Sequence, residues 1–309
     1  MEQNQVGSNI LSFFPGAALN AVAPGLTPLS RLSMKRLYYA LTDRWTTSRK
    51  REVYDCFIFF NELEILKLRL NELYNYVDKF VIVESTRTFH NDPKPLHYLD
   101  NKIHFNEFND KIIYIIVDDM PSTTDPWVNE IHQRNSISRG LARCRDYDII
   151  LVSDVDEIPN PYVIDYYKNN HLYSIINLVQ SLYYYFLNNL ASSTWRLAYI
   201  SSFCNIKGKD LNSIRKRKIK KRHLLFDGGW HFSYMGGVEE IIKKIESFSH
   251  TEYNTDKYKD KNRLIDYLNS GKDLFDRENM KFKIVQLDET YPRYILDNLE
   301  YYQKIGWIK

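Results

Sequence analysis

The pattern of apolar and polar positions becomes regular at about residue 51. A nearly continuous apolar run, Val53 to Phe60, has the composition of a strand that is buried on both faces. Asn61 then stands where a helix N-cap is expected, and apolar residues follow at helical spacing, namely Leu63, Leu66, Leu70 and Leu73. This part of the chain therefore predicts a strand that leads directly into a helix.

The same alternation continues for the next hundred residues. Strands are predicted at Lys79–Glu84, Lys111–Val117 and Asp148–Asp154, and helices at His97–Phe108 and Val128–Arg143. Strands that alternate with helices indicate a largely parallel sheet with right-handed crossovers. Each of the four strands ends at or near an acid or Asn, so polar groups should collect at one edge of the sheet.

The second half of the chain is less regular. Strands are expected at Ser181–Leu187 and Leu197–Ile206, and an amphipathic helix at Tyr258–Leu268. Between them, in Asp227–Glu240, glycine pairs flank several aromatics and His231, so we expect a loop whose backbone turns tightly and approaches a ligand. The whole pattern predicts an α/β fold with a mixed, mostly parallel central sheet flanked by helices.

The strand at 148–154 runs into Asp154-Val155-Asp156-Glu157-Ile158-Pro159. In open α/β sheets, ligands bind at the carboxyl ends of the strands. Alternation along an extended chain sends Asp154 and Asp156 to the same side, about 7 Å apart. Carboxylates that close repel unless one is protonated or a cation lies between them, and Mg²⁺ or Mn²⁺ would share its shell with substrate phosphates. We expect a metal–diphosphate site, although ordinary surface turns also contain Asp-x-Asp.

Two further features carry charge. His231 could complete a metal shell or contact phosphate, and a purely structural role is the alternative. The basic run from Arg215 to His223 suits a nucleotide diphosphate, an anionic membrane surface, nucleic acid or a solvated loop. Since no aromatics interleave with these cations, and the formal net charge is only +3, no nucleic-acid partner is expected.

Composition and the first 50 residues bound the remaining possibilities. Among 309 residues, 44% are hydrophobic, which is typical of a folded protein, and three widely spaced cysteines suggest neither a disulfide framework nor a zinc site. Prolines interrupt the mildly apolar stretch 9–29, and no positive segment precedes it, which argues against a membrane span. We therefore expect a weakly ordered leader or accessory segment at 1–50, followed by a domain at 51–309. Peripheral contact with a membrane is left open, and the protein is expected in the cytoplasm.

Five motifs stand in one order along residues 52–300. Together they resemble glycosyltransferase family 17. The motifs are Tyr54-Asp55-Cys56-Phe57-Ile58-Phe59-Phe60-Asn61-Glu62-Leu63, Val81-Ile82-Val83-Glu84-Ser85, Trp127 with Glu130-Ile131-His132-Gln133-Arg134, Ser153 to Pro159, and Gly229-Trp230-His231-Phe232-Ser233.

The resemblance implies a GT-A fold, a UDP-sugar donor and inversion at the anomeric carbon. The best-known animal member of the family adds N-acetylglucosamine to the core mannose of N-glycans, so this sugar and a glycan or glycoconjugate acceptor are expected. Mn²⁺ or Mg²⁺ would be held by Asp154 and Asp156, with His231 as a further ligand or phosphate contact. The chain departs from the animal enzyme in lacking a convincing signal anchor, so Golgi residence is not expected.

The resemblance also suggests roles for other polar residues. Inversion in one step needs a base near the acceptor hydroxyl. Glu239 matches an acid downstream of the family's Trp-His motif and is the first candidate, with Asp227 and Glu157 as rivals. Arg134 would pair with a donor phosphate or with Glu84. Four residues at the ends of the first two strands would surround the nucleoside, namely Phe59, Asn61, Glu62 and Glu84.

Two other classes of protein fit part of the pattern. A nucleotide-sugar pyrophosphatase or nucleotidyltransferase could use the same metal acids, but the sequence contains no P-loop or glycine-rich phosphate cradle. A non-catalytic carbohydrate-binding module would account for the aromatics and the basic run. It would not account for acids gathered at strand ends, so a metal-dependent glycosyltransferase is the preferred prediction.

Overall fold

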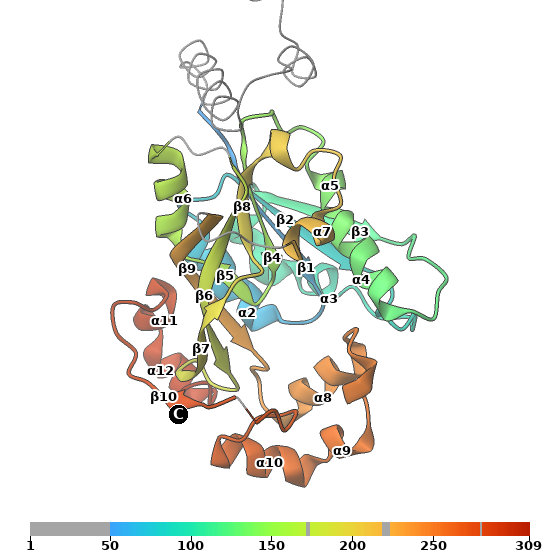
Figure 1. Cartoon of the computed structure of the whole chain (residues 1–309), viewed down its shortest axis with the longest axis vertical. Helices are drawn as coiled ribbons and strands as arrows, with labels where there is room; N and C mark the ends of the chain where they lie inside the picture. Colours follow the sequence, from blue (N-terminus) through green and yellow to red (C-terminus); the bar gives the residue numbers. More distant parts are fainter. Residues whose placement is uncertain (1–49, 171–173, 218–222, 279) are drawn as a thin grey trace, which may run out of the picture. The chain divides into compact units, whose positions relative to one another are not determined.

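The structure is a computed structural model that describes residues 50–170, 174–217, 223–278 and 280–309. Arg51–Lys309 forms a compact unit of its own (Figure 1). The leader predicted at 1–50 lies, apart from Lys50, outside the described residues and stays a prediction. Among the residues described, no helix is both long and apolar enough to cross a membrane.

Four parallel strands form the centre of the sheet. They are β1 (Val53–Phe59), β2 (Lys79–Ser85), β3 (Ile112–Val117) and β4 (Ile149–Asp154), in the spatial order β4-β1-β2-β3. All four lie where the apolar runs predicted them. Because parallel neighbours end at the same edge, the acids that follow them are brought together there.

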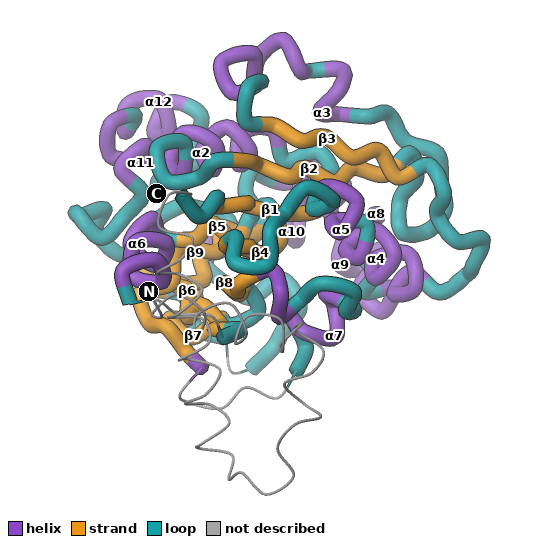
Figure 2. Tube along the Cα trace, turned by 90° about the horizontal axis from the view of Figure 1, so that it is seen from above, coloured by secondary structure: helices purple, strands orange, loops and turns teal. Residues whose placement is uncertain are grey.

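Helices cover both faces of this parallel region. Alternate residues of β1 point to opposite sides, so Phe57 packs in the core beneath α2 (Leu63–Leu73), whereas Cys56 packs with Ile137 of α5 (Ile137–Gly140). Figure 2 shows α4 (Pro126–Asn135), α5 and α7 (Leu211–Arg215) across the strands from α2, α11 (Arg293–Asp297) and α12 (Leu299–Lys304). Both faces of β1, β2 and β4 are thus buried, as nearly unbroken apolar strands require, whereas β3 at the edge of the sheet is partly exposed.

Two helix predictions need correction. The single helix predicted at 128–143 is two helices, because α4 ends at Ser136, whose hydroxyl donates to the carbonyl of His132 at 2.9 Å. The helix predicted at 97–108 is α3 (His97–Asp100) followed by the 3₁₀ helix η3 (Lys102–Phe108). In both cases the element exists but a local turn divides it.

An antiparallel region extends the sheet beyond β4. The order continues through β8 (Tyr199–Ser202), β6 (Ile176–Tyr184), β7 (Asn189–Trp195) and β10 (Lys283–Ile284). The strand expected at 197–206 shortens to β8, because Phe203–Asn205 turns into a 3₁₀ helix, η4. The strand expected at 181–187 begins earlier, as β6. The sequence did not predict β7, in which only Ser193 and Thr194 are exposed.

The first part of the loop predicted at Asp227–Glu240 is a strand, whereas residues 234–237 do form a loop, in which Gly236 and Gly237 have positive φ. β9 (Leu224–Ser233) pairs in parallel with β6 and antiparallel with the short strand β5 (Glu157–Pro159). Gly229 has φ +131°, and a Cβ there would lie 2.1 Å from the carbonyl oxygen of Ile158. Glycine is therefore required by close strand pairing, and not by the approach of a ligand.

The remaining helices complete the unit. α6 (Pro161–Asn169) follows β5, and three helices follow β9: α8 (Val238–Ser247), α9 (Asp256–Lys259) and α10 (Lys261–Ser270), with the 3₁₀ helix η6 (Thr251–Tyr253) after α8. The helix expected at 258–268 is essentially α10. α8 and α10 pack with the ends of β6 and β9 in a separate apolar cluster that includes Tyr184, Tyr234 and Phe275.

Candidate active site

A cavity of about 560 Å³ lies at the carboxyl ends of β1 and β4. Its wall comes from the ends of both strands, the loop after β2, α4, α7, β9 and the segment from α8 to η6. Four carboxylates and seven cationic side chains line it. They are Glu62, Glu130, Asp154 and Asp156, and Arg87, Lys94, Arg134, Arg215, Lys216, Lys244 and Arg277.

A buried arginine fixes the turn that carries the two aspartates. Arg69 of α2 is fully buried and forms two hydrogen bonds to the carboxylate of Asp55, at 2.6 and 2.8 Å. Its Nη1 also donates to the carbonyls of Asp154, Val155 and Glu157, at 2.7, 3.1 and 3.1 Å. One side chain therefore satisfies three carbonyls of the β4–β5 turn. Sequence reasoning missed Arg69, although an aspartate inside an apolar strand signals a buried cationic partner.

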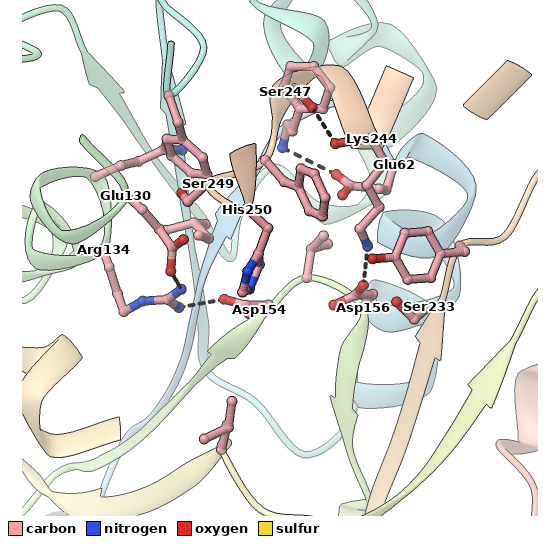
Figure 3. A pocket seen from close by; sticks show the side chains of 18 of the residues that line it. Glu62, Glu130, Arg134, Asp154, Asp156, Ser233, Lys244, Ser247, Ser249 and His250 are labelled. Atoms are coloured by element: carbon pink, nitrogen blue, oxygen red, sulfur yellow. Dashed lines mark hydrogen bonds and ion pairs between the residues drawn. The ribbon is translucent and has the colours of Figure 1, made fainter. Parts of the chain in front are cut away.

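Asp154 is held by two arginines, of which Figure 3 labels Arg134. Nη1 of Arg134 donates to Oδ1 of Asp154, and Nη2 of Arg215 donates to Oδ2 at 2.6 Å. Burial raises the pKa of Asp154, but the two guanidinium groups outweigh it and hold the pKa below its ordinary value. Arg134 binds Glu130 as well, at 2.9 Å, and not Glu84 as the sequence suggested.

Asp156 has different cationic partners. Nζ of Lys244, on α8, lies 2.7 Å from Oδ2 of Asp156, and Nε2 of His231 lies 3.4 Å from the same oxygen. Burial would raise the pKa of Asp156, but Lys244 and then His231 hold it well below the usual range. We call the two aspartates and their partners Arg134, Arg215 and Lys244 the floor network.

Arg215 links the floor network to the strand behind it. Its guanidinium forms a fork with the buried carboxylate of Glu157, at 2.6 and 2.7 Å, while Trp195 donates to the same carboxylate at 2.5 Å. Glu157 is thus occupied within the protein, which leaves it unsuited to the role of base. The sequence placed Arg215 in a basic run without a defined role. Of that run, 218–222 lie outside the described residues.

The donor set of the floor fits a divalent ion in part. Asp154 and Asp156 supply hard carboxylate oxygens, but the described part of the chain contains no group of three or more His, Cys, Asp or Glu side chains that could hold a metal. His231 lies beside Asp156 without completing such a group, so its role as a further ligand or as a phosphate contact stays a prediction. The set therefore fits Mg²⁺ or Mn²⁺ where substrate phosphates supply the remaining oxygens.

The residues predicted around the nucleoside separate into two groups. Phe59 and Glu62 line the cavity, and Asn61 lines an adjoining one. Glu62 stands at the N-cap of α2 in place of the predicted Asn61, whose amide donates to Glu240 at 3.1 Å. Glu84 is fully buried outside both cavities. It accepts hydrogen bonds from Lys94, Tyr114 and the N–H groups of His97 and Tyr98.

None of the three predicted bases lines the cavity. Glu239 lies in the first turn of α8, where its side chain is 66% exposed and pairs with Lys261 at 2.7 Å. Asp227 is exposed on β9, and neither residue lines the cavity. Apart from the aspartates at the end of β4, the carboxylates at the cavity are those of Glu62 and Glu130.

The sequence matches a known family over most of its length and individual curated proteins over about a third of it. The model of glycosyltransferase family 17 matches residues 30–299, beginning upstream of the domain boundary predicted at 51. A rat β-1,4-mannosyl-glycoprotein 4-β-N-acetylglucosaminyltransferase is 29% identical over 117 residues, which are 35% of this chain and 22% of the rat protein. The human protein of the same name is 30% identical over 107 residues, 32% of this chain and 20% of its own. The aligned segments thus span about a fifth of these relatives' lengths.

Proposed function

Because this chain belongs to glycosyltransferase family 17, we propose that it transfers a sugar from a UDP-sugar donor to a glycan hydroxyl, with inversion, on a GT-A-type fold. The observation that carries the proposal is the floor network, in which two aspartates and three cations meet at the carboxyl edge of a parallel sheet. The names of the curated relatives support N-acetylglucosamine as the sugar and a glycoconjugate as the acceptor.

The donor's diphosphate binds at the floor network. Asp154 and Asp156 would hold Mn²⁺ or Mg²⁺, which when bound offsets negative charge on the diphosphate. Arg134, Arg215 and Lys244 surround the same position and stabilise the charge that develops on the departing UDP. Each of these cations is positioned by a carboxylate before the donor binds, and the two aspartates would exchange part of these contacts for the metal ion.

The proton of the acceptor hydroxyl is taken by Glu62. Burial raises the pKa of Glu62 above its ordinary value, although Lys244 lowers it in part, so its carboxylate is a better proton acceptor than an exposed one. Oε2 of Glu62 accepts hydrogen bonds from the N–H groups of Phe60 and Asn61, at 3.2 and 3.1 Å, and these bonds fix the position of the carboxylate. Glu130, the other candidate at the cavity, is committed to Arg134.

Ten aromatic side chains line the cavity and suit the stacking of sugar rings and of the uracil base. They are Phe59, Phe60, Phe89, Trp127, Tyr184, Trp195, Tyr234, Phe248, Tyr253 and Phe275. Their hydrophobic surface also excludes water from the floor, which limits hydrolysis of the donor. The cytoplasmic location expected from residues 1–50 stays a prediction.

Thermal unfolding with UDP tests the donor site. We expect UDP to raise the melting temperature in the presence of Mn²⁺, and to a much smaller extent in chelator. Ligand at about 100-fold over its dissociation constant should add roughly 2.7 kcal/mol to the free energy of unfolding. Equal stabilisation in chelator would contradict a metal-bridged diphosphate.

An assay of UDP-sugar turnover distinguishes the alternatives. A glycosyltransferase releases UDP slowly without acceptor and faster with one. Release of sugar phosphate would indicate a pyrophosphatase, and no turnover with any donor and acceptor pair would favour a non-catalytic binding module.

A further inference from the structure

The mouth of the cavity carries a second cluster of side chains, which we call the rim: Arg87, Phe89, Trp127, Lys216 and His250. All five line the cavity, and they come from the loop after β2, the start of α4, the residue after α7 and the segment after α8. Elements far apart in sequence therefore contribute to one edge of the cavity.

Hydrogen bonds between these loops hold the rim together. The amide of Asn129 donates to the carbonyl of Phe89 at 2.8 Å, and Nε2 of His90 lies 3.1 Å from the carbonyl oxygen of Phe248. The hydroxyl of Ser249 donates to the carbonyl of Pro126 at 3.4 Å. The loop after β2, α4 and the segment after α8 are thus tied to one another, so the rim is a built surface.

Trp127 contacts two other side chains of the rim. Nζ of Lys216 is 4.3 Å from its ring centroid, and the imidazole of His250 meets it edge-on at 4.8 Å. The indole is only partly buried, and Phe89 lies on the same loop-built edge. A half-exposed tryptophan with a cation beside it is suited to stack against a sugar ring while the cation contacts a substituent.

The cations of the rim differ from the others at the cavity. Five of the seven have a carboxylate partner: Lys94, Arg134, Arg215, Lys244 and Arg277. Arg87 and Lys216 are exposed, and neither forms an ion pair with any carboxylate in the described part of the chain. Arg87 donates from Nη1 to the carbonyl of Asn91 at 2.8 Å, which leaves its positive charge uncompensated.

From this arrangement we propose that the rim is the acceptor subsite and that it selects a sugar bearing an anionic group, either a carboxylate or a phosphate. The inference rests on the proposed glycosyl transfer, in which the donor's diphosphate is neutralised at the floor network. Arg87 and Lys216 would then remain as positive charges for the acceptor, with Trp127, which Lys216 contacts, as the stacking surface. Arg and Lys both pair with carboxylate and phosphate oxygens.

The test measures acceptor binding directly, with the full chain loaded with UDP and Mn²⁺. Saturation-transfer NMR titrations compare methyl β-glucuronide, glucose 6-phosphate and the neutral methyl β-glucoside. Because two exposed ion pairs contribute modestly, we expect at least one anionic sugar to bind about five- to tenfold more tightly than the neutral one at low salt. The two anionic arms show whether carboxylate or phosphate is preferred, and added salt should remove the advantage.

The double variant Arg87→Gln/Lys216→Gln should abolish this preference while its affinity for UDP with Mn²⁺ stays at the wild-type value. The matched control is Lys209→Gln/Arg293→Gln, which removes one exposed lysine and one exposed arginine away from the cavity. Equal binding of anionic and neutral sugars, binding of none of the three, or a preference that survives in the rim variant would overturn the proposal. Loss of UDP binding in the wild type would instead contradict the proposed transferase.

Discussion

The floor network and the rim belong to one cavity but handle charge in opposite ways. At the floor, the side chains of Arg134 and Arg215 are only 2% and 3% exposed, and each is matched to a carboxylate. At the rim, Arg87 and Lys216 are exposed and have no such partner among the described residues. A buried charge must be compensated within the protein, whereas an exposed one can remain in water until a ligand arrives.

This difference teaches where mutations should act. Removing one member of the floor leaves another charge buried without a partner, so stability and function should both fall. Removing a cation of the rim leaves no buried charge without a partner. The free energy of unfolding should therefore hardly change, whereas the preference for anionic ligands should change. The predictions below test that contrast in order of decreasing effect.

Arg69→Met should have the largest effect. It removes the partner of the fully buried Asp55 and leaves three carbonyls of the β4–β5 turn without their donor. The loss in the free energy of unfolding should be about 3–5 kcal/mol, as for other broken buried ion pairs. Chemical denaturation measures it, and Arg69→Met/Asp55→Asn should recover part of the loss. A single variant as stable as the wild type would show that the turn is held in another way.

Glu62→Gln should lower turnover by roughly 10²–10⁴-fold, because the amide cannot accept the proton of the acceptor hydroxyl. Its affinity for UDP with Mn²⁺ should stay close to that of the wild type, since the base does not hold the diphosphate. Glu239→Gln, at an exposed carboxylate outside the cavity, is the matched control and should keep full turnover. The reverse result would return the role of base to Glu239.

Asp156→Asn should weaken binding of UDP in the presence of Mn²⁺ by at least about tenfold, since it removes a charged oxygen ligand and frees Lys244. Asp154→Asn should act similarly, and calorimetry measures both. The chelator condition serves as the control, where the variants should differ less from the wild type. Wild-type affinity for UDP–Mn²⁺ in Asp156→Asn would remove the central support for the donor site.

The sequence predicted the strands and the position of the two aspartates, but not the side chains that contact those aspartates. The parallel strands, and the position of Asp154 and Asp156 at their carboxyl edge, were predicted from apolar runs that end in acids. The partners were not, because Arg69, Arg215 and Lys244 reach the β4–β5 turn from distant elements. The local pattern of residues carries no information on such contacts. It also led to the wrong prediction of a loop where β9 lies, because Gly229 allows close pairing with β5. The sequence also could not show that Glu239 lies outside the cavity, because neighbouring positions in the first turn of a helix face different directions.

The pH dependence of stability in chelator should separate two carboxylates at the cavity. The folded pKa of Asp156 is depressed, so its contribution to stability is present above its unfolded pKa, about 3.9, and is lost as pH falls through the folded value. The folded pKa of Glu62 is raised, so its ionised form costs stability above about pH 4.3, and this cost disappears on acidification.

Asp156→Asn should therefore flatten the acid loss in the free energy of unfolding below about pH 4, whereas Glu62→Gln should steepen that loss above about pH 4. Urea denaturation at each pH gives the slopes, and Glu239→Gln is the exposed control. Slopes that shift in the same direction for both variants would contradict the opposite pKa displacements.

The smallest effect is expected at the rim. Arg87→Gln/Lys216→Gln should change the free energy of unfolding by no more than about 0.5 kcal/mol, because both side chains are exposed and neither leaves a buried charge behind. The polar part of glutamine remains solvated, and only the contact of Lys216 with Trp127 is lost. Urea denaturation beside Arg69→Met gives the two ends of the scale in one experiment. A loss above about 2 kcal/mol would mean that the rim cations stabilise the loops around them. The claim that the charges of the rim, unlike those of the floor network, are not needed for stability would then be wrong.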